Sequence, residues 1–364
     1  MRWIFACVGS YPFDMETIDK RPIGGTESCI IYLIQHLLKL DQEVHFFHEH
    51  IDKKSKKNFH QYNMNAFSDI NKISGDILVY IGPTNLIASL KKEKKNLPLI
   101  YWAHQASNQG RESHLKDTNI SSGIDTIVYA SKWQQRDFIQ NLDVSNIKSA
   151  VIGHGVTVEF QNLFSSFDDF KSKKEENFGI YTSVPYRGLE ILVNSEKYLR
   201  SENMTIDIFS SMKIYQKEDT KYLKLIYEIE KKKKFNYFGS VKKKILAEAH
   251  KNKSYFLYPS TYAEIFCCSA IDAIAAGCEV ISSNLGCLKE IYYPYGSFLD
   301  FEEKDNLESF SKRYANLIIS KLNQKKNNFD DWVAKQYEAM MDVHNKFNWV
   351  NRCKEWIKLA QNLT

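Results

Sequence analysis

Short apolar segments alternate with longer helical patterns along most of the chain. The segments span residues 3–8, 43–47, 76–81, 97–102 and 126–129, and then 178–182, 206–210, 235–238, 255–258 and 279–282. Between the first two, Ile30, Leu33, Ile34, Leu37 and Leu38 recur at the spacing of one helix face. Such alternation is typical of βαβ units around a parallel sheet, so we predict an α/β protein.

The length of 364 residues favours two domains, because it exceeds what one hydrophobic core usually serves. The alternation lapses in a polar stretch, residues 161–177, which suits a linker better than a core element. We therefore predict a first Rossmann-like domain over residues 1–165, a second over 170–343 and a final helix over 344–364. In that last helix Trp349, Cys353, Trp356 and Ala360 share one face, so it must dock on a large surface.

The charge of the chain bears on which partners the protein could bind. The net charge of +5 comes from lysine clusters at residues 53–57, 91–95, 231–234 and 242–244. They are either solvated surface or a basic face for anionic lipid head groups or phosphorylated acceptors. No nucleic-acid motif accompanies them, so we expect no nucleic-acid partner.

The chain has seven cysteines, without a Cys-x-x-Cys pair, which we expect to be reduced thiols. The first apolar segment is too short for a signal peptide, and no run reaches the length of a membrane span. We expect a cytoplasmic protein, with peripheral membrane contact as an open alternative.

In open α/β sheets ligands bind beyond the carboxyl ends of the strands. Two loops at such positions are candidate phosphate-binding sites. Gly24-Gly25-Thr26 leads into a helix, where paired glycines and helix amides favour a phosphate; the alternative is a turn with Thr26 as N-cap. The loop from Ser183 to Gly188 places Arg187 after a strand, where it could bind a diphosphate or simply face solvent.

A third loop, within residues 258–277, is the most informative. From residue 265 to 276 the only charged residue is Asp272, so the predicted helix should be buried on most sides. Glu264 precedes Asp272 by eight residues, about two helical turns. Together the two carboxylates could hold hydroxyl-bearing groups with an anion between them. Alternatively, Glu264 compensates its own helix dipole, and Asp272 binds the backbone of a neighbouring strand.

This third loop resembles the retaining glycosyltransferases of the GT-B fold, family 4. The family hallmark is a Glu, seven residues, and a second Glu within a Pro-Ser … Glu-x-Phe-Gly … Glu-Ala run. The matching positions here are Pro259-Ser260, Glu264-Ile265-Phe266, Asp272-Ala273 and Ala276-Gly277. Further matches follow in order: Gly24-Gly25-Thr26, His104, Gly153-His154-Gly155-Val156, Arg187-Gly188 and Phe238-Gly239-Ser240.

The resemblance implies two doubly wound, Rossmann-like domains facing across a cleft, with the acceptor on the first, the donor on the second, and the last helix crossing back. It implies that Glu264 contacts the transferred sugar, Asp272 the ribose and Arg187 the diphosphate, while His104 faces the sugar. The other implied donor contacts are Gly24, Gly25, Thr26, Ser183, Gly239, Ser240 and the backbone at Phe266, Cys267 and Cys268.

Three departures from the family pattern stand out. Asp272 replaces the second Glu and is one methylene shorter, and Cys267 replaces a Gly where backbone normally approaches the ligand. The family's additional Arg is replaced by Thr182 or Ser183, which removes one positive charge from the diphosphate site.

The implied reaction moves a sugar from a UDP- or GDP-linked donor to a hydroxyl of a glycan, glycolipid or glycoprotein, with retained configuration. No Asp-x-Asp motif occurs, so we expect no obligatory metal or cofactor. His45, His48 and His50 could form a metal site, but exposed histidines at the end of a strand are the simpler interpretation. A dehydrogenase is disfavoured because no Gly-x-Gly-x-x-Gly follows a strand. A catalytically weak sugar-nucleotide or glycan-binding relative remains the alternative.

Overall fold

The structure, a computed structural model, describes residues 1–94 and 96–364, so Lys95 of the cluster 91–95 lies outside the described residues. Internal contacts divide the chain into two compact units. The first consists of Met1–Thr17, Thr26–Gly155 and Trp349–Thr364, and the second of Ile18–Gly25 and Val156–Asn348. The division thus falls at Gly155 and Asn348, near the predicted boundaries at 165–170 and 343.

The first unit is built on a sheet with the strand order β3-β4-β2-β1-β5-β6-β7-β8. Its strands are β1 (Arg2–Cys7), β2 (Glu43–His48), β3 (Lys54–Lys56), β4 (Phe59–Asn63), β5 (Ile77–Ile81), β6 (Leu99–Trp102), β7 (Thr126–Tyr129) and β8 (Ser149–Val151). The β3–β4 pair is antiparallel, and the other neighbours pair in parallel. The central strands β1 and β5 are almost wholly buried, as their continuous apolar sequences predict.

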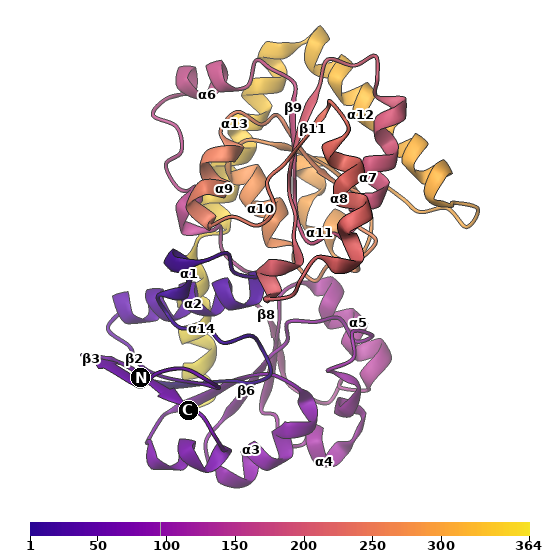
Figure 1. Ribbon diagram of the computed structural model, residues 1–364. Helices are drawn as coiled ribbons and strands as arrows, with labels where there is room; N and C mark the ends of the chain where they lie inside the picture. Colours follow the sequence, from indigo (N-terminus) through magenta and orange to yellow (C-terminus); the bar gives the residue numbers. More distant parts are fainter. Residues whose placement is uncertain (95) are drawn as a thin grey trace. The chain divides into compact units, whose positions relative to one another are not determined.

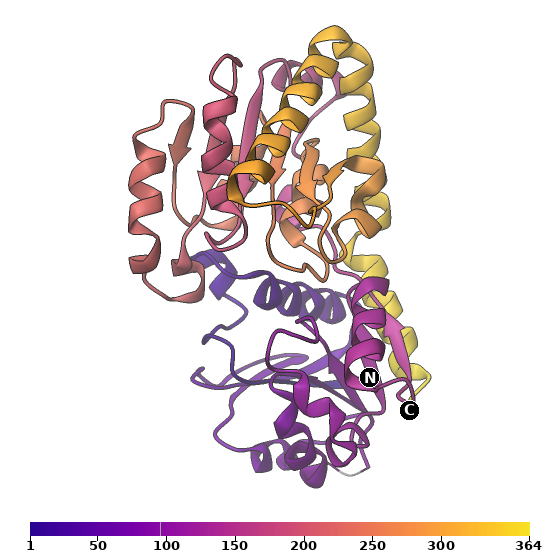
Figure 2. The same ribbon diagram turned by 90° about the vertical axis from the view of Figure 1, so that its right-hand side faces the viewer.

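Helices cover both faces of this sheet, with α2 and α14 on one side and α3 and α4 on the other (Figure 1). The helices of this unit are α2 (Gly25–Lys39), α3 (Ile87–Glu93), α4 (Thr118–Ser121), α5 (Lys132–Leu142) and α14 (Trp349–Gln361). Of the short helix α1 (Thr17–Lys20), only Thr17 belongs to this unit, and residues 18–20 belong to the second. In α14 the four residues of the predicted face are at most 1% exposed. Trp349 packs against Tyr32 of α2, and Trp356 lies edge-on to Trp102 of β6. Both chain ends therefore belong to the first unit (Figures 1 and 2).

The second unit has a parallel sheet with the order β11-β10-β9-β12-β13-β14. Its strands are β9 (Phe178–Thr182), β10 (Thr205–Phe209), β11 (Phe235–Tyr237), β12 (Tyr255–Tyr258), β13 (Glu279–Ser283) and β14 (Gly296–Leu299). The chain adds β10 and β11 on one side of β9, then returns to place β12 on the other. The strand order therefore reverses between β9 and β12, where ligands bind in folds of this type.

Helices lie on both faces of the second sheet, with α7, α8 and α12 on one side and α9, α10 and α13 on the other (Figure 1). The helices of this unit are α6 (Phe167–Lys173), α7 (Leu189–Ser195), α8 (Leu223–Glu230), α9 (Lys243–His250), α10 (Cys268–Ala275), α11 (Leu288–Tyr292), α12 (Leu307–Asn327) and α13 (Phe329–Lys346). The predicted fold class, two doubly wound α/β units, is confirmed. No helix within residues 1–94 and 96–364 is long and apolar enough to cross a membrane.

The polar stretch 161–177 is not only a linker, because it contains α6 and packs into the second unit. Phe170 is fully buried, and a Cβ on Gly277 would lie 2.1 Å from its ring. The buried Lys174 donates from Nζ to the carbonyl of Ala276 at 2.7 Å, and burial lowers its pKa to about 8. The many charged residues suggested an exposed segment, but a lysine ammonium can be buried when backbone carbonyls accept its hydrogen bonds.

Candidate active site

Two loops at the strand-order reversal carry the charged residues predicted from sequence. Arg187 lies in the loop after β9, and Glu264 lies in the loop after the neighbouring strand β12. Parallel strands place their carboxyl ends at the same edge of a sheet, so the two loops meet there.

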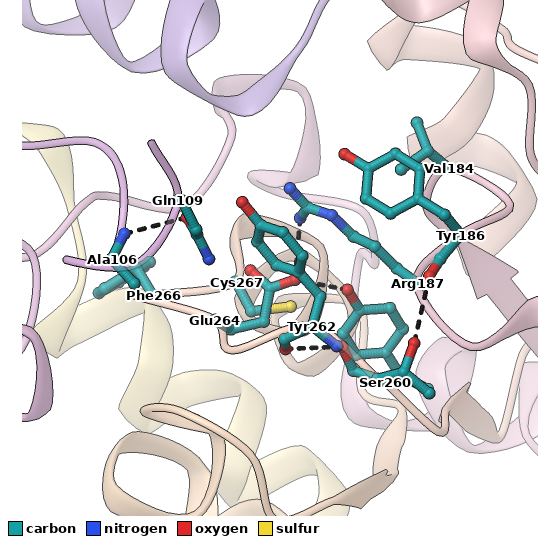
Figure 3. A network of polar contacts seen from close by, with 12 residues as sticks. Ala106, Gln109, Val184, Tyr186, Arg187, Ser260, Tyr262, Glu264, Phe266 and Cys267 are labelled. Atoms are coloured by element: carbon teal, nitrogen blue, oxygen red, sulfur yellow. Dashed lines mark hydrogen bonds and ion pairs between the residues drawn. The ribbon is translucent and has the colours of Figure 1, made fainter. Parts of the chain in front are cut away.

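Arg187 and Glu264 form an ion pair at this edge, with Nη1 2.8 Å from Oε1 (Figure 3). The side chain of Glu264 is 5% exposed and that of Arg187 is 21% exposed. The guanidinium also lies over the ring of Tyr262, 4.3 Å from its centroid. Burial lowers the pKa of Arg187, but Glu264 and the nearby tyrosines together outweigh this effect, so the pKa is well above its ordinary value and the group stays cationic.

Tyr258, which sequence reasoning did not identify, holds the same carboxylate. Its hydroxyl donates to Oε1 of Glu264 at 2.6 Å, and its side chain is 1% exposed. Burial, and then the Glu264 charge, raise the pKa of Tyr258 well above its ordinary value, so the phenol remains a donor. A tyrosine as the last residue of a buried strand was the available signal, because a buried hydroxyl needs a partner.

Two glycines allow the backbone to approach closely enough to build the pair. Gly188 has φ +91°, and a Cβ there would lie 1.9 Å from the carbonyl oxygen of Pro259. Gly286 has φ +68°, and its Cβ would lie 2.2 Å from the carbonyl oxygen of Glu264. Cys287 N donates to that carbonyl at 2.8 Å. The Arg187 loop and the Glu264 loop are therefore fixed by contacts that any larger residue would break.

The prediction that one helix runs from residue 265 to 276 is wrong at its start. The helix α10 begins at Cys268, and Glu264 instead forms an isolated parallel bridge with Gly286. Cys267 has φ +64°, a left-handed conformation that ends any helical continuation toward Glu264. A glycine, which the family has at this position, adopts such a φ without strain. Glu264 and Asp272 therefore do not lie on one helix.

Asp272 lies inside α10 and is 2% exposed. Its Oδ1 accepts from Thr157 N at 2.9 Å, and its Oδ2 accepts from Thr157 Oγ1 at 2.7 Å. Lys243 Nζ is 3.8 Å from Oδ2. Burial raises the pKa of Asp272, while Lys243 and the two Thr157 hydrogen bonds lower it, and the net direction is upward. The carboxylate thus has a backbone partner of the kind considered as its alternative role, although Thr157 lies outside the strands, near the start of the second unit's long segment.

The other predicted donor residues of the second unit lie around the same sheet edge. Ser183 follows β9, while Gly239 and Ser240 follow β11, where Ser240 Oγ donates to the carbonyl of Ser211 at 3.4 Å. Phe266 is buried, and Tyr292 donates to its carbonyl at 2.5 Å, while Cys268 opens α10.

Three buried polar atoms near this edge have no hydrogen-bond partner within residues 1–94 and 96–364. They are Arg187 Nε, Thr182 Oγ1 and Ser210 Oγ. Thr182 ends β9 opposite Phe209 of β10, and Ser210 comes next, so the two hydroxyls belong to adjacent strand ends. Unsatisfied buried groups are rare, and at a strand-order reversal they indicate a polar ligand.

Two of the predicted residues, His104 and Thr26, belong to the first unit. His104 stacks on His154, with ring centroids 5.5 Å apart, and burial lowers its pKa well below the ordinary value, so it is neutral. Thr26 belongs to the first unit, whereas Gly24 and Gly25 are grouped with the second. The helix α2 begins at Gly25, so Thr26 lies in its first turn and is not its N-cap.

The histidines near the end of β2 also differ from expectation. His45 and His48 are buried rather than exposed, and they point to opposite faces because three residues separate them on a strand. They therefore cannot form one site with His50. A group in the described part of this unit that could hold an ion is instead Glu43, His45 and His60.

Known proteins resemble this chain in part of its sequence and in its fold. Residues 169–331 match the sequence model of the family described as glycosyl transferases group 1. No curated protein sequence matches the chain significantly.

Solved structures match over the full length of the chain. Sucrose-phosphate synthase from Thermosynechococcus elongatus has a TM-score of 0.75 at 14% identity, covering 100% of this chain and 99% of its own. Anabaena HepE in complex with UDP-glucose has a TM-score of 0.70 at 14% identity, with 100% of both chains covered. A glycosyltransferase from Rickettsia africae has a TM-score of 0.71 at 15% identity, covering 100% and 98%. Residues 169–331, within the second unit, thus resemble the group 1 glycosyl transferases, and the whole chain has the fold of the GT-B glycosyltransferases.

Proposed function

We propose that the protein transfers a sugar from a nucleoside diphosphate to a hydroxyl group, with retention of the anomeric configuration. The observation that carries this proposal is the buried Arg187–Glu264 pair beside the unpartnered Arg187 Nε, at the strand-order reversal. A departing diphosphate needs positive charge and donors aimed at its oxygens, and a glycosyl group needs an acceptor for its hydroxyls. Arg187 and Glu264 are suited to those two tasks.

In this proposal Arg187 binds the diphosphate, with Thr182 and Ser210 as neighbouring hydroxyl donors. Tyr262 holds the guanidinium plane by stacking on it, at 4.3 Å. Glu264, oriented by Tyr258, accepts from a hydroxyl of the transferred sugar. Ser183, Gly239, Ser240 and the backbone from Phe266 to Cys268 complete the donor site. The family resemblance adds His104 as a contact of the sugar and the Gly24-Gly25-Thr26 loop as a contact of the phosphate.

Charge stabilisation by Arg187 and by loop amides leads us to propose a reaction without an obligatory metal. UDP is the first donor nucleotide to test, because the structurally similar HepE is described in complex with UDP-glucose, and GDP is the second. The acceptor is a hydroxyl of a glycan, glycolipid or glycoprotein. A cytoplasmic location is supported by the seven cysteines of the described residues, which are all free thiols, and contact with a membrane surface stays a prediction.

The test is calorimetric titration with UDP and GDP, together with an assay of donor consumption with and without a chelator. Arg187→Ala should weaken nucleoside-diphosphate binding more than tenfold, or about 1.4 kcal/mol. Arg187→Lys is the matched control, because it keeps the charge but loses Nε and the fork, so an intermediate affinity is expected. Unchanged affinity in Arg187→Ala would move the diphosphate elsewhere.

The alternative function, a catalytically weak binder of sugar nucleotides or glycans, is favoured by the replacements at Cys267 and Asp272. The two proposals differ in whether donor is consumed. Binding of a broad donor panel without turnover or slow hydrolysis would support the binder.

A further inference from the structure

Strand pairing in the first unit brings His60 beside Glu43 and His45, which lie about fifteen residues earlier in the chain. The strands β2 and β4 pair in parallel, with His45 directly opposite His60. Glu43 lies two residues before His45, so its side chain is on the same face of the sheet. Its Oε1 is 3.0 Å from His45 Nε2 and 3.9 Å from His60 Nε2.

These three donor atoms are spaced as the ligands of a single ion. All lie within 4.8 Å of one another. Zinc binds histidine nitrogen and carboxylate oxygen at about 2.0–2.2 Å, so an ion between the donors needs only small side-chain adjustments. Two imidazoles and a carboxylate favour a first-row dication such as Zn²⁺ over Mg²⁺ or Ca²⁺, which prefer oxygen alone.

The surroundings fix the orientation of the central ligand. The hydroxyl of Tyr62 lies 3.1 Å from His45 Nδ1, which leaves Nε2 directed at Glu43. The rings of His45 and His60 are stacked, with centroids 4.9 Å apart and an interplanar angle of 20°. Metal-binding histidines typically have such a partner on the second nitrogen, which sets the tautomer and the ring plane.

Access and local charge are compatible with an ion. The side chain of His45 is 8% exposed, but those of Glu43 and His60 are 38% and 26% exposed, so solvent reaches the outer side. Two cations lie nearby. Arg2 pairs with Glu43 in the β1–β2 register, but its guanidinium donates to Ser74, and Lys53 lies over the Tyr62 ring, 6.0 Å from its centroid.

We propose that Glu43, His45 and His60 bind one Zn²⁺ ion, with a water molecule in the remaining position. The ion would join β2 to β4, and through β4 it would stabilise the β3–β4 pair at the edge of the sheet. This inference is independent of the proposed glycosyl transfer, because it concerns the sheet of the first unit and residues that the proposed donor site does not use.

The test is titration of the full-length, metal-free protein with Zn²⁺, followed by calorimetry and by thermal unfolding. One equivalent should bind and raise the melting temperature. His60→Gln and Glu43→Gln should each weaken binding about 100-fold or more, and Tyr62→Phe should weaken it about tenfold. His50→Asn is the matched control, since it changes an exposed neighbouring histidine and should bind as the wild type does.

Two further measurements separate this site from thiols and from non-specific binding. Co²⁺ bound at a site with nitrogen and oxygen ligands should show d–d bands without thiolate charge-transfer absorption. Arg2→Gln should strengthen Zn²⁺ binding, because it removes a positive charge that acts on His45. Equal binding in the wild type and in a His45→Gln/His60→Gln variant, or no saturable binding by the wild type, would overturn the proposal.

Discussion

The two carboxylates of the family-like motif, Glu264 and Asp272, are both nearly inaccessible, yet they do different things. Glu264 lies in a loop and is held by side chains, the cationic Arg187 and the phenol of Tyr258. Asp272 lies inside a helix and holds the backbone N–H and the hydroxyl of Thr157, at the start of the second unit. The comparison teaches that one carboxylate is held by side chains at the strand-order reversal, whereas the other fixes the course of the backbone at Thr157.

The largest expected effect separates the two by activity. Glu264→Gln keeps an oxygen that can accept from Tyr258, but it removes the charge. Transfer should fall about 100-fold or more, or about 2.7 kcal/mol, while the protein still folds. Steady-state donor consumption and circular dichroism measure the two properties, with Tyr258→Phe as a milder control. Near-normal turnover in the folded variant would refute the assignment of Glu264.

The second effect separates them by stability. Asp272→Ala leaves the Thr157 N–H without its acceptor in a buried position, so unfolding should require about 2 kcal/mol less. Asp272→Asn keeps a carbonyl oxygen and should lose less than half of that. Urea denaturation measures both variants.

Donor affinity in Asp272→Asn then tests the ribose contact implied by the family resemblance. An affinity close to that of the wild type is expected if Asp272 acts through Thr157. A loss of more than tenfold would instead place the ribose on this carboxylate.

A smaller effect is expected at Cys267, which separates the two carboxylates along the chain. Its φ of +64° is unfavourable for any residue with a Cβ. Cys267→Gly should therefore be more stable than Cys267→Ala by about 1 kcal/mol, as measured by denaturation. Equal stabilities would mean that this residue leaves the left-handed conformation in solution.

The smallest effect is a change in pH dependence. Because burial raises the pKa of Asp272, the folded protein keeps this proton to a higher pH than the unfolded chain, whose aspartate titrates near about 3.9. The stability from this group is present below that value and is lost as pH rises through the raised pKa. Asp272→Asn should remove this part of the pH profile, and Lys243→Ala should extend it to higher pH. Profiles that coincide with the wild type would contradict the raised pKa.

Much of the central architecture could be predicted from the sequence, because buried parallel strands are continuous apolar runs. Segments 126–129, 178–182 and 255–258 coincide with β7, β9 and β12. The edge strand β3 and its neighbour β4 could not be found, since polar residues such as Lys54, His60 and Gln61 occur there without an apolar run. Few of their side chains are buried, so their composition resembles that of a loop.

The candidate site was predictable in its residue types but not in its connections. Arg187 and Glu264 were identified from their positions after strands, and the structure brings them together. Tyr258 was missed because its role depends on which side chain lies above a strand end. The helical relation assumed between Glu264 and Asp272 failed because one residue, Cys267, has an unusual backbone conformation that its sequence does not announce.

The last helix has a consequence for the order in which the protein is completed during synthesis. Residues 349–364 belong to the first unit, where Trp349 and Trp356 are each 1% exposed. Gly155 lies so close to Trp349 that an added Cβ would be 2.8 Å from its indole. A ribosome therefore finishes every strand of the second unit before it releases the helix that seals the first. The first unit is therefore the first to be synthesised and the last to be completed. Until α14 packs on it, the surface that this helix covers is exposed to the cell's chaperones and proteases.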